Sequence, residues 1–359
     1  MAEPFKNLFN LTLIKNLSSE ILIIYPTFDS RKFKVSVFDE DWDNRELKDR
    51  MHHISVCLRK RLPDDYIEAV DILLKVSSNS SGFQFMFFPD FVEMYGLDYF
   101  EKSVEALEFF TTSSSSEFAV RPFIVKYPDK MMKQMMIWAK SENHHIRRLS
   151  SEGCRPRLPW AMALPEFKKD PTTVIKLLEN LKNDESEYVR RSVANNLNDI
   201  SKDHPDLVLK LAKEWKGQSP ETDQLIKHAC STMLKKGLTE VLELFGFGNP
   251  ENINLSEFHV DRDVKLGDKI QFGFSISSEK GRLGKLRIEY AIDFMKSNGK
   301  QAAKVFKISE GNYQDNVKKI TRHYSFKKIT TRKYYCGLHG ISIIINGKEF
   351  IRGEFVLLD

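Results

Sequence analysis

Apolar residues recur every three or four positions along the first two thirds of the chain, which is typical of amphipathic helices. Two clear examples of this spacing are Phe5, Leu8, Leu11, Leu13 and Leu17, and further on Leu47, Met51, Ile54, Leu58 and Leu62. Pro63 and the two aspartates after it signal that one helix ends and the next begins. We therefore expect this part of the chain to be all-α.

One aromatic segment interrupts the helical pattern. Residues 83–91, FQFMFFPDF, are dense in phenylalanine and follow a polar break at residues 77–82. Taken alone, the segment could be a strand. Because it lies among helices, we expect it to be a loop that packs into the core.

Helices in the middle of the chain repeat. Residues 146–148 (IRR), 189–191 (VRR) and 226–228 (IKH) align at spacings of 43 and 37 residues. Spacings in this range are typical of HEAT-type helical pairs. Several of the predicted helices start at prolines, which suit the first turn, and they cover residues 128–140, 171–181 and 205–215.

The aligned helices also share a polar stripe. Arg191, Asn195 and Asp199 stand at i, i+4 and i+8, and Arg148 and Glu152 match the first two of them. A single stripe of this kind is usually a solvated face. Because the stripe recurs with matched arginines, we expect it to line the concave surface that curved solenoids use for ligands.

After Leu244 the pattern changes to alternation, which is typical of strands. Residues 269–277 and 341–345 are clear examples, and Asn346-Gly347 is a hairpin signal. About seven short strands in roughly 100 residues predict an immunoglobulin-like sandwich. The predicted architecture is a helical domain at 1–245, a linker at 246–256 and an all-β domain at 257–359.

Charge is distributed unevenly over the two parts. The net charge is +5, yet the first 254 residues hold 35 Lys and Arg against 38 Asp and Glu, while the remainder holds 20 against 12. The excess of positive charge in the C-terminal part favours a polyanionic partner. The four cysteines are scattered, no apolar run is long enough to span a bilayer, and the first residues lack a secretory pattern. We expect a cytoplasmic protein without a membrane segment.

Residues 141–160, SENHHIRRLSSEGCRPRLPW, concentrate candidate chemistry. Arg148 and Glu152 share a helix face, and Gly153 is expected to end the helix in the left-handed conformation. The loop that follows carries Arg155, Arg157 and Trp160 between two prolines. Rigid loops with arginine and an aromatic ring suit phosphate clamping and base stacking. The alternative is a helix end followed by a solvated basic loop.

This stretch resembles the signature of the AlkC-type DNA alkylation-repair glycosylases, relatives of AlkD built from HEAT-like helical repeats. Three more segments match that family in order, at residues 62–66, 116–123 and 189–200. The likeness runs from about Phe5 to Phe245. The resemblance implies a DNA glycosylase, and it also implies the C-terminal immunoglobulin-like domain, which some AlkC-type proteins carry.

The substrate that the resemblance implies is a cationic N3-alkylated base, namely 3-methyladenine, with 3-methylcytosine as a second candidate. Its glycosidic bond is already weak, because the departing base leaves neutral. An enzyme then needs negative charge beside the sugar and a positioned water, both of which carboxylates supply. Glu117, Glu152 and Asp199 lie in three of the matched motifs, and we expect them around the lesion, with Glu117 orienting the water.

Other residues are expected to bind the DNA. The ring face of Trp160 can attract a cationic base, although Trp160 could equally be a structural anchor. The expected backbone contacts are Arg148, Arg155, Arg157, Arg191 and Asn195 in the helical domain and Lys327, Lys328, Arg332 and Lys333 in the sandwich. Arg148 and Glu152 could also pair with each other.

No metal or cofactor is expected. No lysine stands out as a Schiff-base nucleophile, which points to a monofunctional enzyme that leaves the strand intact. We expect it to act as a monomer on alkylated double-stranded DNA at the bacterial nucleoid. The alternative is a non-catalytic helical-repeat protein that binds DNA or serves as a scaffold. A protein that only binds DNA would need the arginines but would have no use for Glu117 and Glu152, which repel phosphate.

Overall fold

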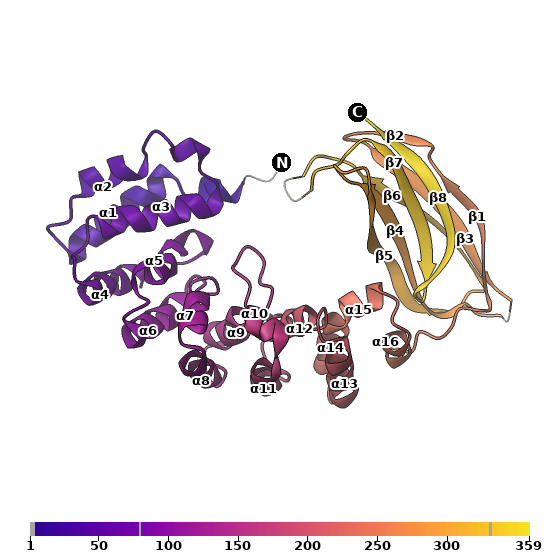
Figure 1. Ribbon diagram of the computed structural model, residues 1–359, viewed down its shortest axis with the longest axis horizontal. Coiled ribbons are helices and arrows are strands. Elements are labelled where there is room, and N and C mark those ends of the chain that lie inside the picture. The colour runs from indigo at the N-terminus through magenta and orange to yellow at the C-terminus, as the bar shows by residue number, and fades with distance from the viewer. Residues whose placement is uncertain (1–3, 79, 280, 330–331) are drawn as a thin grey trace. The chain divides into compact units, whose positions relative to one another are not determined.

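The computed structural model describes residues 4–78, 80–279, 281–329 and 332–359. The chain forms two compact units, one made of residues 1–204 and 215–229 and the other of residues 205–214 and 230–359. Within the described ranges, the first unit consists of helices, and the second contains all the strands together with short helices (Figure 1).

The helices begin and end as follows: η1 Phe5–Leu8, α1 Leu11–Ile24, α2 Ser30–Val37, η2 Trp42–Asn44, α3 Leu47–Arg59, α4 Tyr66–Ser77, η3 Phe83–Phe85, α5 Phe87–Tyr95, α6 Phe100–Thr111, α7 Val120–Lys126, α8 Pro128–Trp138, α9 His144–Gly153, α10 Pro165–Lys169, α11 Thr172–Leu181, α12 Glu187–Ile200, α13 Pro205–Trp215, α14 Pro220–Ala229, α15 Ser231–Lys235 and α16 Thr239–Leu244. Several starts are fixed by side-chain caps. Asn10 accepts a hydrogen bond from the amide of Leu13 at 3.0 Å, and Asp65 accepts one from the amide of Glu68 at 2.8 Å.

The aromatic segment at 83–91 is not a loop, as the sequence had suggested to us. Phe83–Phe85 forms a single 3₁₀ turn, and α5 begins directly after it at Phe87. Phe87, Phe88 and Phe91 are almost completely buried on one face of α5. Apolar residues at i, i+1 and i+4 suit a short buried helix, and Pro89 is tolerated because it stands in the first turn.

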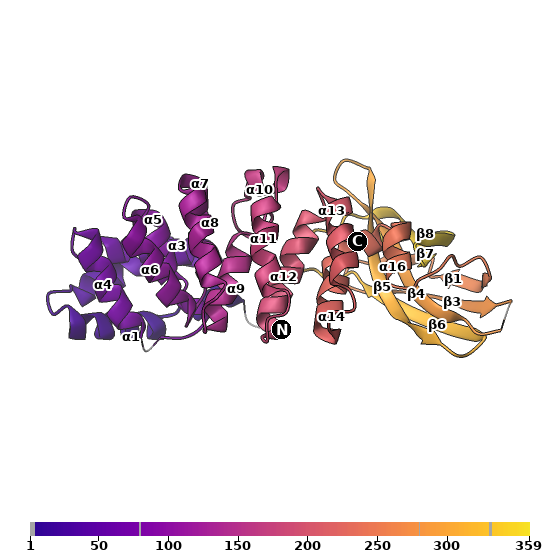
Figure 2. The same ribbon diagram turned by 90° about the horizontal axis from the view of Figure 1, so that it is seen from below.

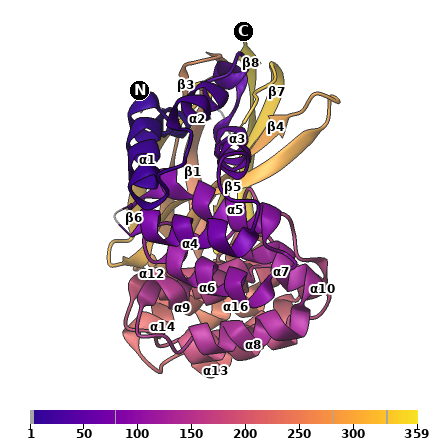
Figure 3. The same cartoon turned by 90° about the vertical axis from the view of Figure 1, so that its left-hand side faces the viewer.

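The helices of the first unit pack on one another in sequence order. α1 contacts α2 and α4, and Figure 3 shows α1, α2 and α3 grouped together, with α4, α6 and α8 beyond them. α9 packs against α12, and α12 packs against α14, so the three aligned segments are neighbours in space. Figure 2 shows these helices standing side by side, as expected for a helical repeat.

The strands of the second unit form two sheets. Their bounds are β1 Ile253–Val260, β2 Asp263–Lys265, β3 Lys269–Ser278, β4 Gly284–Met295, β5 Gln301–Tyr313, β6 Val317–Ser325, β7 Gly337–Ile345 and β8 Lys348–Leu358. One sheet has the order β1-β3-β6 and the other β2-β8-β7-β4-β5, with β2 parallel to β8. Ile270, Phe272 and Phe274 of β3 share one buried hydrophobic core with Ile288 and Ile292 of β4.

The predicted hairpin is confirmed. β7 and β8 are joined by Asn346 and Gly347, with φ of 45° and 79°, as a two-residue primed turn requires. The strands β1 and β2 were not anticipated in detail. β1 alternates poorly, because most of its residues are exposed or half-buried, and β2 is only three residues long.

Helix α16 and the residues after it pack within the second unit. A Cβ on Gly347 would lie 2.7 Å from Leu242 Cδ1, so only glycine permits this close approach. Asn346 donates a hydrogen bond from Nδ2 to the carbonyl of Gly248 at 2.8 Å, and Phe247 is buried. The segment expected to be a linker is therefore anchored to the β7–β8 turn.

None of the helices in the described part of the chain is both long enough and apolar enough to cross a bilayer.

Candidate active site

The residues of the 141–160 stretch form α9 and the loop after it. Asn143 caps α9 by accepting a hydrogen bond from the amide of His145 at 2.8 Å. Ile146 and Leu149 are buried on the apolar face of the helix. The opposite side presents Arg148 and Glu152, which lie four residues apart and therefore point in nearly the same direction.

Gly153 ends α9, as predicted, but for a different reason. Its φ lies outside the left-handed region, and it is the last helical residue. A Cβ at this position would come within 2.6 Å of Val120 Cγ1 and 3.2 Å of Met135 Cε. Glycine is needed here because α7 and α8 approach the end of α9 closely.

Three carboxylates and two arginines form a continuous chain of ion pairs, which we call the ion network. Arg148 pairs with Glu117 through Nη1, and its Nη2 lies 3.4 Å from Glu152 Oε1. Arg155 donates from Nη1 to Glu152 at 2.8 Å and from Nε to Asp199 Oδ2 at 2.9 Å. The structure thus brings together carboxylates from the turn before α7, from α9 and from α12.

The carboxylates of the ion network differ in their surroundings. Glu152 accepts a further hydrogen bond from Ser192 Oγ at 2.6 Å, and Asp199 accepts one from Lys202 Nζ at 2.8 Å. Their side chains are 6% and 3% exposed. Glu117 is 16% exposed, and Ser115 Oγ donates to its Oε2 at 3.0 Å. Within the described ranges, the other oxygen of Glu117, Oε1, has no hydrogen-bond donor, so it is the one best able to bind water.

Glu117 does not lie in a helix. It stands in a turn, and α7 begins three residues later at Val120. Ser115 nevertheless holds it, because the Glu117 amide donates to Ser115 Oγ at 3.4 Å.

Arg148 and Arg155 are buried within the ion network, and this placement argues against their expected role of gripping phosphates. Each arginine side chain is at most 15% exposed, and both guanidinium groups form ion pairs with carboxylates of the chain itself. Burial alone would lower the pKa of each arginine, but the charges of Glu117, Glu152 and Asp199 raise it above its ordinary value. Both groups therefore stay charged and hold the carboxylates in position.

This placement changes what replacing Arg148 by alanine should do. Removing one partner of a buried pair leaves the other charge uncompensated, at a cost of about 3 kcal/mol. We expect the Arg148→Ala protein to unfold at lower denaturant concentration and to lose activity, while the salt dependence of its DNA affinity stays unchanged. Arg191→Ala is the matched control for the unfolding measurement alone, since Arg191 holds the same position one repeat later but is 62% exposed. A normal unfolding midpoint for Arg148→Ala together with weaker DNA binding would contradict this assignment.

The predicted polar stripe of α12 is divided by the twist of the helix. At about 100° per residue, Asp199 lies about 80° around the helix from Arg191 but only about 20° from Tyr188. Arg191 is exposed and paired with Glu187 at 2.7 Å, Asn195 is half-buried, and Asp199 is buried. The stripe that faces α9 contains instead Tyr188, Ser192, Asn196 and Asp199.

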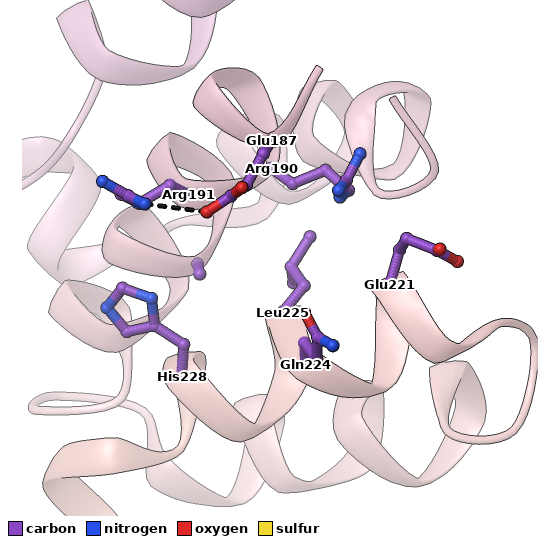
Figure 4. A pocket seen from close by; sticks show the side chains of 8 residues that line it. Glu187, Arg190, Arg191, Glu221, Gln224, Leu225 and His228 are labelled. Atoms are coloured by element: carbon purple, nitrogen blue, oxygen red, sulfur yellow. Dashed lines mark hydrogen bonds and ion pairs between the residues drawn. The ribbon is translucent and has the colours of Figure 1, made fainter. Parts of the chain in front are cut away.

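Arg191 borders a small pocket between α12 and α14 (Figure 4). Arg190 and Glu187 line it from α12, and Gln224 and His228 line it from α14. Burial, followed by the charges of Arg191 and Arg155, lowers the pKa of His228. The pocket therefore combines cationic groups with the carboxylates of Glu187 and Glu221, and Arg191 is exposed at its edge while paired with Glu187.

Trp160 stands in the connection from α9 to α10, which extends away from these two helices in Figure 1. Its ring is 64% exposed, and its φ of 64° is in the left-handed region. Arg157, in the same connection, donates from Nη2 to both oxygens of Asp203, at 2.6 and 2.8 Å. Arg157 therefore has an internal carboxylate partner, whereas the Trp160 ring is exposed.

The four basic residues singled out in the sandwich do not behave alike. Lys327, Lys328 and Lys333 are exposed. Arg332 is instead half-buried, with its guanidinium 4.3 Å from the ring centre of Phe294. It also donates to the hydroxyl of Tyr324 at 3.1 Å. The two threonines between them, at 330 and 331, lie outside the described residues.

Some residues of the site had no recognisable signal in the sequence. Ser192 and Ser115 each donate to a network carboxylate, and Arg148 lies over the Tyr188 ring at 4.9 Å from its centre. Serines are common on helix surfaces, so their role is visible only once the helices are packed. Tyr188 could have been found from its position one turn before Ser192. In the described part of the chain, no group of three or more His, Cys, Asp or Glu could hold a metal ion.

Two family models of known proteins match this chain. The family model described as "DNA alkylation repair enzyme" matches residues 84–236, which include the whole ion network. A second family model, described as the C-terminal Ig-like domain of the uncharacterised protein YhaZ, matches residues 254–359. The fold is that of a helical-repeat DNA alkylation-repair enzyme with an immunoglobulin-like C-terminal domain.

Two relatives match this chain over almost its full length. The chain is 47% identical to the uncharacterized protein YhaZ of Bacillus subtilis (strain 168) over 345 residues, 96% of each protein. It is 36% identical to the alkylpurine DNA glycosylase AlkC of Pseudomonas fluorescens, solved bound to DNA containing an abasic site analog. That match has a TM-score of 0.92 and covers 99% of this chain and 100% of that one. This chain belongs to the AlkC family of DNA alkylation-repair enzymes.

Proposed function

We propose that this chain is a monofunctional DNA glycosylase that releases cationic N3-alkylated bases, 3-methyladenine first and 3-methylcytosine second, from double-stranded DNA in the bacterial nucleoid. The observation that carries the proposal is the ion network, which gathers Glu117, Glu152 and Asp199 from three elements onto two shared arginines. Family membership supports it, because the relative AlkC is an alkylpurine DNA glycosylase.

The chemistry follows from the charge of the damaged base. As the glycosidic bond stretches, positive charge moves from the base onto the sugar, and the base departs neutral. A fixed carboxylate beside the sugar stabilises this charge without needing to protonate the base. The arginines keep the carboxylates oriented before the substrate arrives, so little reorganisation is needed during the reaction.

Glu117 is the residue we assign to the attacking water. Its Oε2 is held by Arg148 and Ser115, while Oε1 has no donor among the described residues. An oxygen in this position can accept a hydrogen bond from water and take up a proton as the water attacks. Glu152 and Asp199 are more deeply buried and more fully bonded, and we assign them to electrostatic stabilisation.

The exposed aromatic ring and the exposed cations supply binding. Trp160 can stack on or over the cationic base, an interaction of about 0.5–2 kcal/mol. Arg191 and Asn195 on α12, together with Lys327, Lys328 and Lys333 in the sandwich, are the proposed contacts to DNA. We assign Arg148, Arg155 and Arg332 to internal contacts, because their guanidinium groups are occupied within the chain.

A protein that only binds DNA is the competing candidate, and the ion network argues against it. Such a protein would direct its arginines outward, toward phosphate. In this chain Arg148 and Arg155 instead hold carboxylates that would repel phosphate. An arrangement in which two arginines pair with three carboxylates suits catalysis better than DNA binding.

Base release from methylated DNA tests the proposal directly. Purified protein should release 3-methyladenine from alkylated duplex DNA without added metal, and EDTA should leave the rate unchanged, because the assigned chemistry uses only carboxylates and water. High-performance liquid chromatography of released bases measures this. The product DNA should be intact as released and should break only when it is heated in alkali, as expected for a strand that carries an abasic site. Loss of release on adding EDTA would contradict the mechanism, and no release under any condition would leave DNA binding as the function.

A further inference from the structure

The connection that carries Trp160 is held at both of its ends by one buried side chain. Arg121 of α7 is fully buried, and it donates from Nη1 to the carbonyl of Gly153 at 2.8 Å and from Nε to the carbonyl of Met162 at 2.7 Å. The first carbonyl belongs to the last residue of α9, and the second lies in the connection two residues after Trp160. Arg121 therefore fixes the distance between two points on either side of Trp160, but it makes no contact at Trp160 itself.

The tip of the loop is held by a different element. Lys48, near the start of α3, donates from Nζ to the carbonyl of Trp160 at 2.8 Å, although the two residues lie 112 positions apart. Trp160 has a φ of 64°, a conformation that residues other than glycine keep only when their surroundings hold it. The hydrogen bond from Lys48 is made to this same residue.

The surroundings of Lys48 connect it with the ion network as well. Its ammonium lies 4.8 Å from the ring centre of Phe118, the residue directly after Glu117. The carboxylates of Asp90 and Glu93 on α5 also interact electrostatically with it. The ammonium of this exposed lysine therefore lies close to α5, the Glu117 turn and the Trp160 loop.

We propose that Lys48 is a positioning residue of the glycosylase. By donating to the Trp160 carbonyl while packing on Phe118, it keeps the exposed Trp160 ring at a fixed place relative to the Glu117 carboxylate. The N-terminal helices thereby take part in the site, although the carboxylates come from later elements. The catalytic part of this inference rests on the proposed function, whereas the structural part does not.

Lys48→Met tests the inference, because methionine keeps the aliphatic length and can still pack on Phe118 but has no donor. We expect the single-turnover rate of base release, measured with enough protein to saturate the DNA, to fall about tenfold, which corresponds to about 1.4 kcal/mol of the barrier. Lys48→Arg, which restores a donor, should return the rate to within about threefold of wild type. Lys15→Met, on an exposed lysine of α1, is the matched control and should change neither rate nor spectrum.

The ¹⁹F NMR spectrum distinguishes a Lys48 that positions the Trp160 loop from a Lys48 that binds phosphate. The chain has four tryptophans, of which Trp42, Trp138 and Trp215 are buried, so incorporated 5-fluorotryptophan should give four ¹⁹F resonances, and Trp160→Phe identifies the one of interest. In Lys48→Met the Trp160 resonance should narrow and move toward its unfolded position, while the other three stay in place.

Three results would overturn the inference. One is an unchanged Trp160 resonance in Lys48→Met. Another is a moved resonance with a normal rate. A third is a normal rate at saturation combined with a salt slope of DNA affinity reduced by about 0.9, which would make Lys48 a phosphate contact. If the wild-type protein released no base, the proposed function would fail, yet the ¹⁹F spectra would still decide whether Lys48 holds the loop.

Discussion

Replacing Glu117 by glutamine should slow base release by about a hundredfold to a thousandfold, the range found when a group that stabilises the transition state or moves a proton is removed. The amide oxygen can still accept hydrogen bonds from Arg148 and Ser115, so the fold should survive the change. What disappears is the negative charge and the ability to take a proton from water. Single-turnover release of 3-methyladenine, with protein in excess over DNA, measures this effect without interference from product release.

The control variants separate catalysis from stability. Glu101→Gln removes a carboxylate that is 84% exposed on α6 and should behave as wild type. Glu152→Gln and Asp199→Asn should lose activity and also unfold more easily, because each carboxylate is almost fully buried against Arg155. If Glu117→Gln kept a rate within twofold of wild type, another residue would have to orient the water.

Replacing Lys327, Lys328 and Lys333 together by alanine should weaken DNA binding strongly and make it less sensitive to salt. All three side chains are exposed, and no Asp or Glu occurs between Asn316 and Lys348 to neutralise them. Each lost phosphate contact lowers the logarithmic salt slope by about 0.9, so the triple variant should lose about 2.7. The ratio of the wild-type binding constant to that of the triple variant should then fall about fortyfold between 50 and 200 mM salt. Fluorescence anisotropy with a labelled duplex at several salt concentrations measures the slope.

A matched triple variant controls for net charge. Lys265, Lys296 and Lys300 are also exposed in the β domain, and replacing them by alanine removes the same charge elsewhere. Ending the chain near Asn249 would be a less clear test, because Phe247 and Leu242 are buried within the same compact unit as the strands. If the two triple variants bound DNA with the same affinity and the same salt slope, the surface around Lys327, Lys328 and Lys333 would have no specific role in DNA binding.

The sequence predicted much of the fold because most elements have a regular hydrophobic period. Helices such as α12 and the β7–β8 hairpin follow directly from the spacing of apolar residues and from Asn346-Gly347. Short elements without such a period were missed. The buried α5 has aromatic residues at positions that suit a helix or a packed loop equally well, and β1 is too exposed to alternate.

The site was predicted only in part, for a physical reason. The carboxylates Glu117, Glu152 and Asp199 were named from matched motifs, and the structure brings them together. The partners of the arginines could not be named, because an arginine on a helix surface can pair inward or point outward, and tertiary packing decides which. The rotation of about 40° between residues four apart likewise separates Arg191 from Asp199 along what had looked like one stripe.

The ion network also bears on how fast the enzyme can find its substrate. Its three carboxylates are balanced by Arg148, Arg155 and Lys202, so this part of the molecule carries almost no formal charge. A neutral site neither attracts nor repels a polyanion at long range, whereas exposed lysines do attract one. Encounter rates should therefore depend on the lysines of the β domain, and changes within the ion network should alter the chemical step and the lifetime of the complex while leaving the association rate constant nearly the same.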